Sequence, residues 1–341
     1  MGAQGLKEVL VKHETSFDEL RGVLAVDAFN TLYQFLTIIR QPDGTPLMDS
    51  KGRITSHLRG LLYRTCSLLE KDVKPVFVFD GEPSPLKRAT IAERVEKKQE
   101  AEELLKKARE EGRIEDAAIL AQRTARLTKD MVAESKELLD ALGVPHVDAP
   151  SEGEAQCAAM AAKGLVSAAA SQDFDALLFG APVLVRNLTV AGKRKLPRRN
   201  IFVDVVPERY VLDECVKTLG ITRERMVWMA MLMGTDFNAG VFGIGPKKAL
   251  KLVKEHDTLE AVAKAAKAET AEFEPVLHLF MKPPFREVTK KELVFREPDR
   301  ERVVATMCAE HDFDETRVRN AMARAFHEPD DEKQGTLRGW C

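Results

Sequence analysis

The stretch Pro75-Val76-Phe77-Val78-Phe79-Asp80 is a short apolar run that ends in a carboxylate. An upstream run, Val23-Leu24-Ala25-Val26, is closed by Asp27 in the same way. Runs this short and this apolar are typical of strands that are buried on both faces of a parallel sheet. Ligands of such sheets bind in the crevice outside the carboxyl ends of the strands. Both aspartates are therefore predicted to line a ligand site.

Further carboxylates stand at the ends of apolar or helical segments along the chain. The full set of seven is Asp27, Asp80, Glu152, Glu154, Asp173, Asp175 and Asp236. Bare acids gathered at one edge raise one another's pKa values unless cations neutralise them. Oxygen ligands without thiolate or imidazole suit Mg²⁺, for which Mn²⁺ can substitute. Two such ions, about 4 Å apart, could activate water against a phosphodiester.

Each aspartate taken singly is more often structural, because Asp commonly caps a helix that follows a strand. Seven acids at matching positions favour a metal-dependent phosphoesterase over that reading. In Glu152-Gly153-Glu154, the missing side chain of the glycine would let a phosphate or metal come close. In Asp173-Phe174-Asp175, two carboxylates would point to the same side if the backbone were extended.

Composition limits the class of protein. The 341 residues are 44% hydrophobic and 31% charged, with a net charge of −2, as in a globular protein. No signal peptide and no apolar run of membrane-spanning length is evident, so we expect an intracellular protein. Five cysteines lack zinc spacing, and seven histidines form no catalytic grouping. Basic islands at 193–195, 198–199 and 247–248 allow local contact with phosphate despite the net charge.

One α/β domain is predicted over residues 1–326. Strands are expected at 23–27, 75–80, 145–147, 168–172, 182–188 and 200–205. Helices are expected at 28–39, 55–71 and 131–142, in a segment capped by Ser151 that reaches residue 162, and from 207 onward. The alternation predicts a mostly parallel central sheet flanked by helices.

Residues 84–130 are rich in Glu, Lys, Arg, Gln and Ala, which favours helix with little apolar surface to bury. Gly112 divides this segment into two arms, and we expect a helical excursion that projects from the domain. Most of its charges are expected to be solvated. Lys87 and Arg94 share a helix face near the acids. There they could neutralise a phosphate as charge develops in the transition state.

The stretch Gly243-Ile244-Gly245-Pro246-Lys247-Lys248-Ala249 is typical of a helix-hairpin-helix, which we expect over residues 222–268. Its glycines would let backbone N–H groups reach a phosphate, and Lys247 and Lys248 add charge. An ordinary glycine-rich helix connection is the alternative. Contacts of this type read no bases, so recognition should depend on nucleic-acid structure. Tyr33 could belong to the core or stack on a base, and the residues alone leave both readings open.

Several segments resemble the archaeal and eukaryotic flap endonucleases, and the resemblance covers essentially the whole chain. The most specific are Ala149-Pro150-Ser151-Glu152-Gly153-Glu154-Ala155, Ser171-Gln172-Asp173-Phe174-Asp175, Gly234-Thr235-Asp236-Phe237 and the glycine-rich hairpin. The resemblance implies a PIN-like nuclease core, a helical arch and a hairpin region that grips branched duplex DNA. It also implies Mg²⁺-dependent removal of 5′ flaps near the single-strand/double-strand junction, and it allows a 5′–3′ exonuclease activity.

The resemblance assigns a role to individual residues. Asp27, Asp80, Glu152 and Glu154 match one metal subsite, and Asp173, Asp175 and Asp236 match the other. Lys87 and Arg94 match basic residues on the scissile phosphate, and Tyr33 matches an aromatic near the unpaired end. Gly2 matches a processed N-terminus beside the site, and Thr55 and Arg64 match residues that grip a one-nucleotide 3′ flap.

The tail over residues 327–341 is predicted to be flexible. It resembles a PCNA-type sliding-clamp peptide, with Gln334, Leu337 and Trp340 in the expected places. Cys341 replaces the second aromatic, so clamp binding should weaken by ~1–2 kcal/mol. The family's hairpin also holds K⁺, but the hydroxyl that serves as one ligand is replaced here by Gly240.

Three readings of function stay open at this point. The leading one is a monomeric flap endonuclease of Okazaki-fragment maturation and base-excision repair, in an archaeal cytoplasm rather than a nucleus. A related 5′→3′ exonuclease, or a nuclease acting on bubbles or nicks, is the second. The third, from a different class, is a catalytically silent protein that binds DNA junctions and the clamp.

Overall fold

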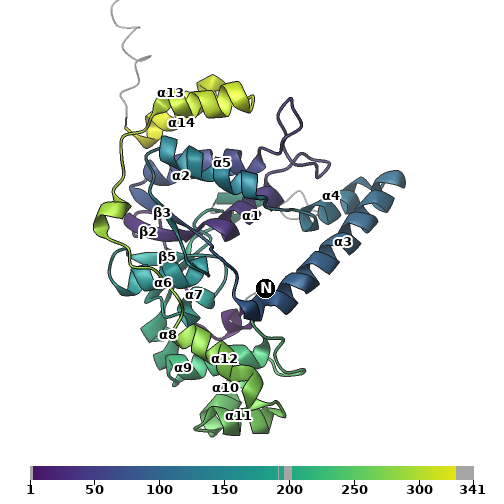
Figure 1. Cartoon of the computed structure of the whole chain (residues 1–341), viewed down its shortest axis with the longest axis vertical. Coiled ribbons are helices and arrows are strands. Elements are labelled where there is room, and N and C mark those ends of the chain that lie inside the picture. The colour runs from purple at the N-terminus through teal and green to yellow at the C-terminus, as the bar shows by residue number, and fades with distance from the viewer. Residues whose placement is uncertain (1–2, 191, 196–201, 328–341) are drawn as a thin grey trace, which may run out of the picture.

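The computed structural model describes residues 3–190, 192–195 and 202–327. At its centre lies a seven-stranded sheet in the order β1-β9-β6-β5-β2-β3-β4, with helices on both faces (Figure 1). Its strands are β1 His13–Glu14, β2 Gly22–Asp27, β3 Val73–Phe79, β4 His146–Asp148, β5 Ala168–Ala170, β6 Val183–Arg186 and β9 Glu208–Val211. A separate two-stranded sheet pairs β7 (Gly192–Lys195) with β8 (Phe202–Val205).

The sheet is mostly parallel, as predicted. Strands β6, β5, β2, β3 and β4 run in parallel, while β9 pairs antiparallel with β6 and β1 pairs antiparallel with β9. The prediction that the chain is helical from residue 207 was wrong at its start, because β9 precedes the next helix. Tyr210 is fully buried opposite Leu184 of β6. Pairing with a distant strand therefore overrides the local helical pattern.

Both faces of the sheet are buried, which explains the continuous apolar runs. Along β3, Val76 and Val78 enter one hydrophobic cluster, and Phe77 and Phe79 enter the other. The second cluster is covered by α1 (Ala28–Ile38), α2 (Ser56–Leu69), α5 (Lys129–Ala141), α13 (Arg300–Val304) and α14 (Glu315–Ala325). The first is covered by α6 (Gly153–Ala162), α7 (Asp175–Leu178), α8 (Leu212–Leu219) and α9 (Arg223–Met233).

Two helices form the predicted excursion and project from the body (Figure 1). They are α3 (Arg88–Glu110) and α4 (Ile114–Arg123), and the break between them falls at Gly112, where φ is +70°. Leu105, Ala108, Ala117 and Ala121 are the buried residues of a small cluster between the arms. The far arm returns to the body: a Cβ on Gly44 would lie 2.5 Å from Cα of Ala118. We call this excursion the arch.

Helices α9, α10 (Pro246–Glu255), α11 (Leu259–Ala266) and α12 (Thr270–Met281) gather at the other end of the molecule from α13 and α14 (Figure 1). The loop 234–245 joins α9 to α10 and contains the predicted hairpin. Among the described residues, no helix combines the length and the apolar character that crossing a membrane requires. The division of the chain at residue 326 stays a prediction, since residues 328–341 lie outside the described part.

A candidate active site at the switch point of the sheet

Strand order fixes where the acids meet. From β2 the chain builds outward through β3 to β4, and then returns to place β5 on the other side of β2. The carboxyl ends of β2 and β5 therefore form a topological switch point, where α/β sheets bind ligands. Asp27 is the last residue of β2, and Asp173 follows β5 closely. The sheet brings these two acids together from distant parts of the sequence.

Burial and mutual repulsion shift the pKa values of the acids that follow β2 and β3. Burial, followed by repulsion from Asp80 and Asp173, raises the pKa of Asp27 to about 8. Burial, followed by repulsion from Glu152, raises the pKa of Asp80 to about 6. These carboxylates lie in one another's electrostatic field, as the strand-end pattern predicted.

The remaining acids belong to the same field. Burial, followed by repulsion from Asp173 and Asp236, raises the pKa of Asp175 to about 7. The pKa of Glu154 is also raised, by burial and then by Asp175, Asp173 and Asp27. The structure therefore assembles all seven predicted carboxylates into one cluster. Below we call them the acid cluster.

Two acids of the cluster also have a structural task. Asp27 is the N-cap of α1 and accepts the N–H of Asn30 at 3.0 Å, so the capping interpretation holds alongside the site. Asp80 accepts the N–H of Gly153 at 2.7 Å. A Cβ on Gly153 would stand 2.5 Å from Oδ1 of Asp80. The space that the sequence suggested for a ligand is thus taken by the Asp80 carboxylate.

The start of α6 differs from the expectation. Its N-cap is Glu152 rather than Ser151, and no side chain caps the helix there. The Glu152 carboxylate is turned instead toward the arch, where it accepts from the backbone N–H of Ser84 at 3.4 Å and pairs with Lys87. Because the Glu152 side chain does not cap the helix, its carboxylate is available to the site.

Asp173 and Asp175 do not lie on extended backbone, so the condition under which their side chains would point to the same side is not met. Strand β5 ends at Ala170, and Phe174 has helical angles (φ −87°, ψ −1°) as the N-cap of α7. The two carboxylates nevertheless stay in each other's field, because the turn keeps them beside the end of the sheet. Asp175 also accepts the N–H of Ala3 at 3.1 Å, which brings the described N-terminus to the cluster.

Two cations at the base of the arch lie on the acid cluster. Lys87, at the end of a short 3₁₀ helix (Pro85–Lys87), pairs with Glu152 and lies 3.9 Å from Asp236. Arg94 on α3 donates to both carboxylate oxygens of Asp236, at 2.7 and 2.6 Å. Burial alone would lower the pKa of Lys87, but these carboxylates outweigh it and raise the pKa. The side chains predicted to face a phosphate therefore face the acids.

The donor set fits a hard divalent cation, because it offers only carboxylate oxygens in a buried, strongly negative cluster. Within residues 3–190, 192–195 and 202–327, no three His, Cys, Asp or Glu side chains are already arranged around one point at ligand distance. Two reasons are visible in the structure. Like charges repel, and Glu152 and Asp236 bind Lys87 and Arg94.

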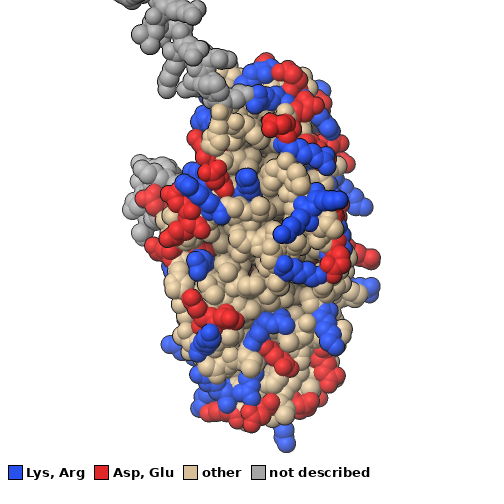
Figure 2. All heavy atoms as spheres, turned by 90° about the vertical axis from the view of Figure 1, so that its left-hand side faces the viewer, with Lys and Arg blue, Asp and Glu red and all other residues tan. Residues whose placement is uncertain are grey.

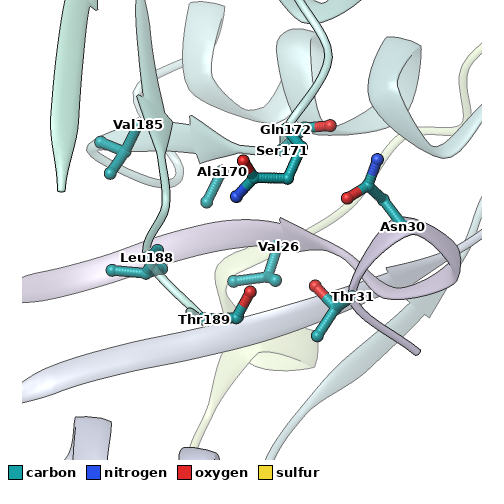
Figure 3. A pocket seen from close by; sticks show the side chains of 9 residues that line it. All are labelled: Val26, Asn30, Thr31, Ala170, Ser171, Gln172, Val185, Leu188 and Thr189. Carbon is teal, nitrogen blue, oxygen red and sulfur yellow. The ribbon is translucent and has the colours of Figure 1, made fainter. Parts of the chain in front are cut away.

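Some residues at the cluster were missed by sequence reasoning. The Asn30 side chain donates to Asp173 at 3.1 Å, and the Ser171 hydroxyl lies 2.7 Å from Glu154. Both line a cavity of about 10 Å³ at the carboxyl ends of β2 and β5 (Figure 3). Thr90 of α3 donates to the backbone carbonyl of Asp236 at 2.8 Å. Only Asn30 carried a local signal, since it stands three residues after a helix-capping Asp.

The residues predicted to contact DNA beside the cluster differ in exposure. Tyr33 is 38% exposed on α1, and Nζ of Lys98 from the arch lies 5.2 Å from its ring centroid. This excludes a fully buried core role for the ring. Thr55 is buried at the N-cap of α2, which leaves little of its side chain for contact with DNA. Arg64 is partly buried on the same helix, and burial lowers its pKa.

The predicted hairpin lies at the start of α10. Gly243 has φ of +75°, and a Cβ on Gly243 or Gly245 would meet nothing within 4 Å. Lys247 and Lys248 are exposed in the first turn of the helix, and Phe242 before them is fully exposed. On the face turned away from the arch, by contrast, acidic and basic side chains are interspersed (Figure 2).

Gly240 stands where the family resemblance places the hydroxyl of a K⁺ ligand. Its φ is +75°, and a Cβ there would stand 2.4 Å from the backbone nitrogen of Gly234. No side chain fits at this point of the loop. Gly2 and the tail residues Gln334, Leu337 and Trp340 lie outside the described residues.

Comparisons with known proteins find relatives over nearly the whole chain. Residues 1–101 match the XPG N-terminal domain, and residues 143–236 match the XPG I-region. A flap endonuclease 1 of Pyrococcus furiosus is 48% identical over 335 residues, covering 98% of this chain and 97% of that protein. A flap endonuclease 1 of Ignicoccus hospitalis is 49% identical over 346 residues, covering 99% and 98%.

Solved structures confirm the α/β nuclease fold. Flap endonuclease-1 from Methanococcus jannaschii superposes with a TM-score of 0.74 at 39% identity, covering 94% of this chain and 96% of that one. The catalytic core of Rad2 in complex with a DNA substrate gives 0.67 at 25% identity, covering 92% and 96%. Together with the full-length relatives, these matches place the protein: the chain belongs to the flap endonuclease family of structure-specific nucleases.

Proposed function

We propose that this enzyme hydrolyses a phosphodiester near the single-strand/double-strand junction of 5′-flapped DNA, with two Mg²⁺ ions held by the acid cluster. One observation carries the proposal. All seven predicted carboxylates meet at the switch point of the sheet, and two arch cations lie on them. Nucleases of this family generally use divalent metals. The hard oxygen donors favour Mg²⁺, and Mn²⁺ shares their preference.

The acids would act as two subsites. Asp27, Asp80, Glu152 and Glu154 form the first, and Asp173, Asp175 and Asp236 form the second. Mg²⁺ bound there would supply Lewis-acid polarisation of the phosphate and an activated water. The raised pKa values of Asp27 and Asp175 support this assignment, because they report an excess of buried negative charge that divalent cations would compensate.

Lys87 and Arg94 would bind the scissile phosphate and stabilise the charge that develops on it. Their present partners, Glu152 and Asp236, are the same kind of oxygen anion that a phosphate offers. A DNA phosphate would thus exchange one anionic partner for another, with no unpaired buried charge left on the cations. Lys98 over the Tyr33 ring would similarly give way to a stacked base.

Duplex DNA would be held away from the cluster by the hairpin. Lys247 and Lys248 have no ion-pair partner within the described part of the chain, and the space beside Gly243 and Gly245 is open. Backbone N–H groups and ammonium groups at a helix N-terminus suit a phosphate. Gly2, Thr55 and Arg64 would contribute contacts at the junction, although the burial of Thr55 limits its share.

A substrate comparison tests the reaction. Wild-type enzyme with Mg²⁺ should cut a double-flap DNA faster than a blunt duplex or a bubble, and preference for the bubble would favour the alternative nuclease. Asp175→Ala should retain flap binding in a gel-shift assay while kcat falls by at least ~10³-fold. Wild-type rates in that variant would refute the metal assignment. Absence of any cutting by the wild type would support the silent junction binder.

The arch cations have a separate test. Lys87→Ala and Arg94→Ala should each lower the single-turnover rate by ~10²-fold, since each removes one donor to the developing charge. Flap affinity should change little, because the hairpin contacts persist. A variant that weakened binding but cut at the wild-type rate when saturated would contradict the transition-state role.

The proposed activity also implies where the enzyme works and what it binds. A flap-removing enzyme would act in Okazaki-fragment maturation and base-excision repair. Because its relatives quoted above are archaeal, it would work in the cytoplasm, where the archaeal chromosome lies. The tail residues Gln334, Leu337 and Trp340 would tether a monomer of the enzyme to a PCNA-type sliding clamp. Without a hydroxyl at Gly240, K⁺ would have to be held by the remaining oxygens of the hairpin.

A further inference from the structure

Two uncharged side chains connect the two proposed metal subsites. Asn30 donates its backbone N–H to Oδ1 of Asp27 at 3.0 Å and its side-chain amide to Oδ2 of Asp173 at 3.1 Å. The Ser171 hydroxyl lies 3.3 Å from Oδ2 of Asp27 and accepts the N–H of Asp173 at 3.2 Å. These polar contacts thus run in a ring through Asp27, Asn30, Asp173 and Ser171, and the Ser171–Asp27 contact is a hydrogen bond when the Ser171 proton points to Asp27.

Ser171 also contacts an acid on α6, in addition to those at the ends of β2 and β5. Ser171 Oγ lies 2.7 Å from Oε1 of Glu154, which belongs to α6. A hydroxyl has one proton, so Ser171 donates to Glu154 or to Asp27 but not to both at once. Because Ser171 is buried, a hydrogen bond to a charged carboxylate here is not weakened by competing water. One side chain therefore touches acids from β2, α6 and the loop after β5.

Helix capping accounts for only part of this arrangement. The backbone hydrogen bond from Asn30 to Asp27 is the ordinary cap of α1 and does not depend on the side chain at position 30, proline excepted. The hydrogen bond from the Asn30 side-chain amide to Asp173 joins residues that are 143 positions apart and has no role in the cap. Ser171 likewise links segments that are 144 residues apart. Each side chain contacts a carboxylate of one proposed subsite, and a backbone N–H completes the link to the other: that of Asn30 binds Asp27, and that of Asp173 binds Ser171.

The chemistry of the two linkers suits a metal site. A lysine or arginine could also hold two carboxylates together, but its charge would compete directly with a metal cation. An amide and a hydroxyl bind carboxylate oxygens without adding charge. Each takes up one lone pair and leaves the remaining lone pairs of the oxygens for a metal. Neutral donors in this position are therefore the kind that orient metal ligands from behind.

We propose that Asn30 and Ser171 are positioning residues that fix the separation of the two metal subsites, by tying Asp27 and Glu154 of the first to Asp173 of the second. This inference rests on the proposed two-metal function. Loss of either side chain should let the repelling carboxylates move apart. The binding of the second ion should suffer most, because it depends on a site already shaped around the first.

The cavity beside these residues supplies a conservative variant and a matched control. Ser171→Thr keeps the hydroxyl and adds one methyl group next to this cavity, whose volume of about 10 Å³ is at the lower limit for holding one water (Figure 3). Thr189 lines the same cavity, but its hydroxyl donates to Gln34 at 3.0 Å. Thr189→Ala therefore perturbs the cavity and leaves the acids alone.

The test is calorimetric titration of Mg²⁺ into the full-length protein without DNA, joined to single-turnover cutting of a flap. Asn30→Ala and Ser171→Ala should each weaken binding of the second ion by about 10- to 100-fold. Saturating Mg²⁺ should restore part of the cutting rate, while the KM for DNA stays unchanged. Ser171→Thr and Thr189→Ala should bind Mg²⁺ like the wild type.

The outcomes separate the two proposals. Wild-type Mg²⁺ binding in both Asn30→Ala and Ser171→Ala would overturn the positioning role and leave the two-metal function intact. A wild type that bound no Mg²⁺ and cut no flap would overturn the function itself. Thermal unfolding of every variant shows whether it is folded. If only one of the two variants folds, its Mg²⁺ binding decides, and wild-type binding in that variant overturns the positioning role.

Discussion

At the scale of single residues, Gly153 lies against the Asp80 carboxylate, in a place that a side chain would occupy. Its missing side chain admits the Asp80 carboxylate, which a Cβ would approach to 2.5 Å while the backbone N–H of the same glycine holds it at 2.7 Å. The position lies at the start of α6 with no positive φ, so the backbone itself would accept alanine. The requirement for glycine comes from the site and not from the fold.

We therefore expect Gly153→Ala to fold with a stability within about 1 kcal/mol of the wild type, since alanine favours helix and offsets a weakened hydrogen bond. Mg²⁺ affinity, measured by calorimetry, should fall by about tenfold or more because Asp80 is displaced. Unchanged affinity would mean that Asp80 tolerates the shift, and the contact would then be structural only.

At the scale of elements, the hairpin before α10 contains glycines that the backbone conformation requires and others that it does not. Gly245 has φ of −95° and ψ of −179°, which any residue adopts, and open space where a Cβ would be. Neither the backbone nor internal packing demands glycine there. A close approach by an external surface would explain it.

Gly245 is also the N-cap of α10, a position that favours glycine over alanine, which opposes the gain from a less flexible unfolded chain. Gly245→Ala should therefore change the free energy of unfolding by no more than about 1 kcal/mol and should weaken binding to duplex DNA. Lys247→Ala should weaken it differently, by reducing the slope of log affinity against log salt by about 1. Fluorescence anisotropy over a salt series measures both effects. Full affinity in Gly245→Ala would exclude a close approach of DNA at this glycine.

The turn before α2 is joined to the C-terminal helices through Asp49. This buried carboxylate accepts from Nε of Arg53 at 2.7 Å and contacts Nδ1 of His311 at 3.2 Å. Burial alone would raise the pKa of Asp49, but the Arg53 backbone and guanidinium, with His311, outweigh it and lower the pKa to about 2. A carboxyl whose folded pKa is depressed stabilises the fold above its unfolded pKa, near 4.

That stabilisation is lost as pH falls from about 4 through about 2, because the folded carboxylate must then be protonated. Asp49→Asn should accordingly be less stable than the wild type at pH 6, and the difference should shrink toward pH 2. Urea unfolding of both proteins at a series of pH values measures it. A difference that did not vary with pH would show that the charge of Asp49 contributes nothing.

At the scale of the whole molecule, the arch, the carboxyl ends of the central strands and the hairpin occupy different parts of the structure. The base of the arch contacts the acid cluster through Lys87 and Arg94, while α10 lies toward the end of the molecule opposite α13 and α14 (Figure 1). A branched DNA could therefore contact the cluster and the hairpin at once. None of the residues assigned to cutting belongs to the tail, so recruitment and chemistry should be separable.

Deleting residues 334–341 should abolish stimulation by a PCNA-type clamp and leave basal flap cutting unchanged. Cys341→Phe should strengthen clamp binding by about 1–2 kcal/mol, roughly tenfold, because a ring fills an apolar pocket that a thiol does not. Surface plasmon resonance with immobilised clamp measures the affinities. Persistent stimulation of the truncated enzyme would place the clamp contact elsewhere on the chain.

The sequence by itself determined the features that depend on local pattern. The apolar runs ending in Asp27 and Asp80 predicted parallel strands and a crevice at their ends, because burial on both faces demands apolar residues at every position. The charged segment with Gly112 at its centre predicted two exposed helical arms. The start of α10 at Pro246 followed from proline's place in a first helical turn.

Only the tertiary structure decided what depends on distant partners. Strand β9 forms because Tyr210 pairs with Leu184 of β6. The Asp80 carboxylate fills the place beside Gly153, 73 residues away, and Asn30 reaches Asp173 across 143 residues. The local sequence around Ser171, Lys87 and Arg94 does not show which acids these side chains contact. Hydrogen bonds and charges act over a few ångströms of space, and residues that are far apart along the chain become neighbours only when the sheet has formed.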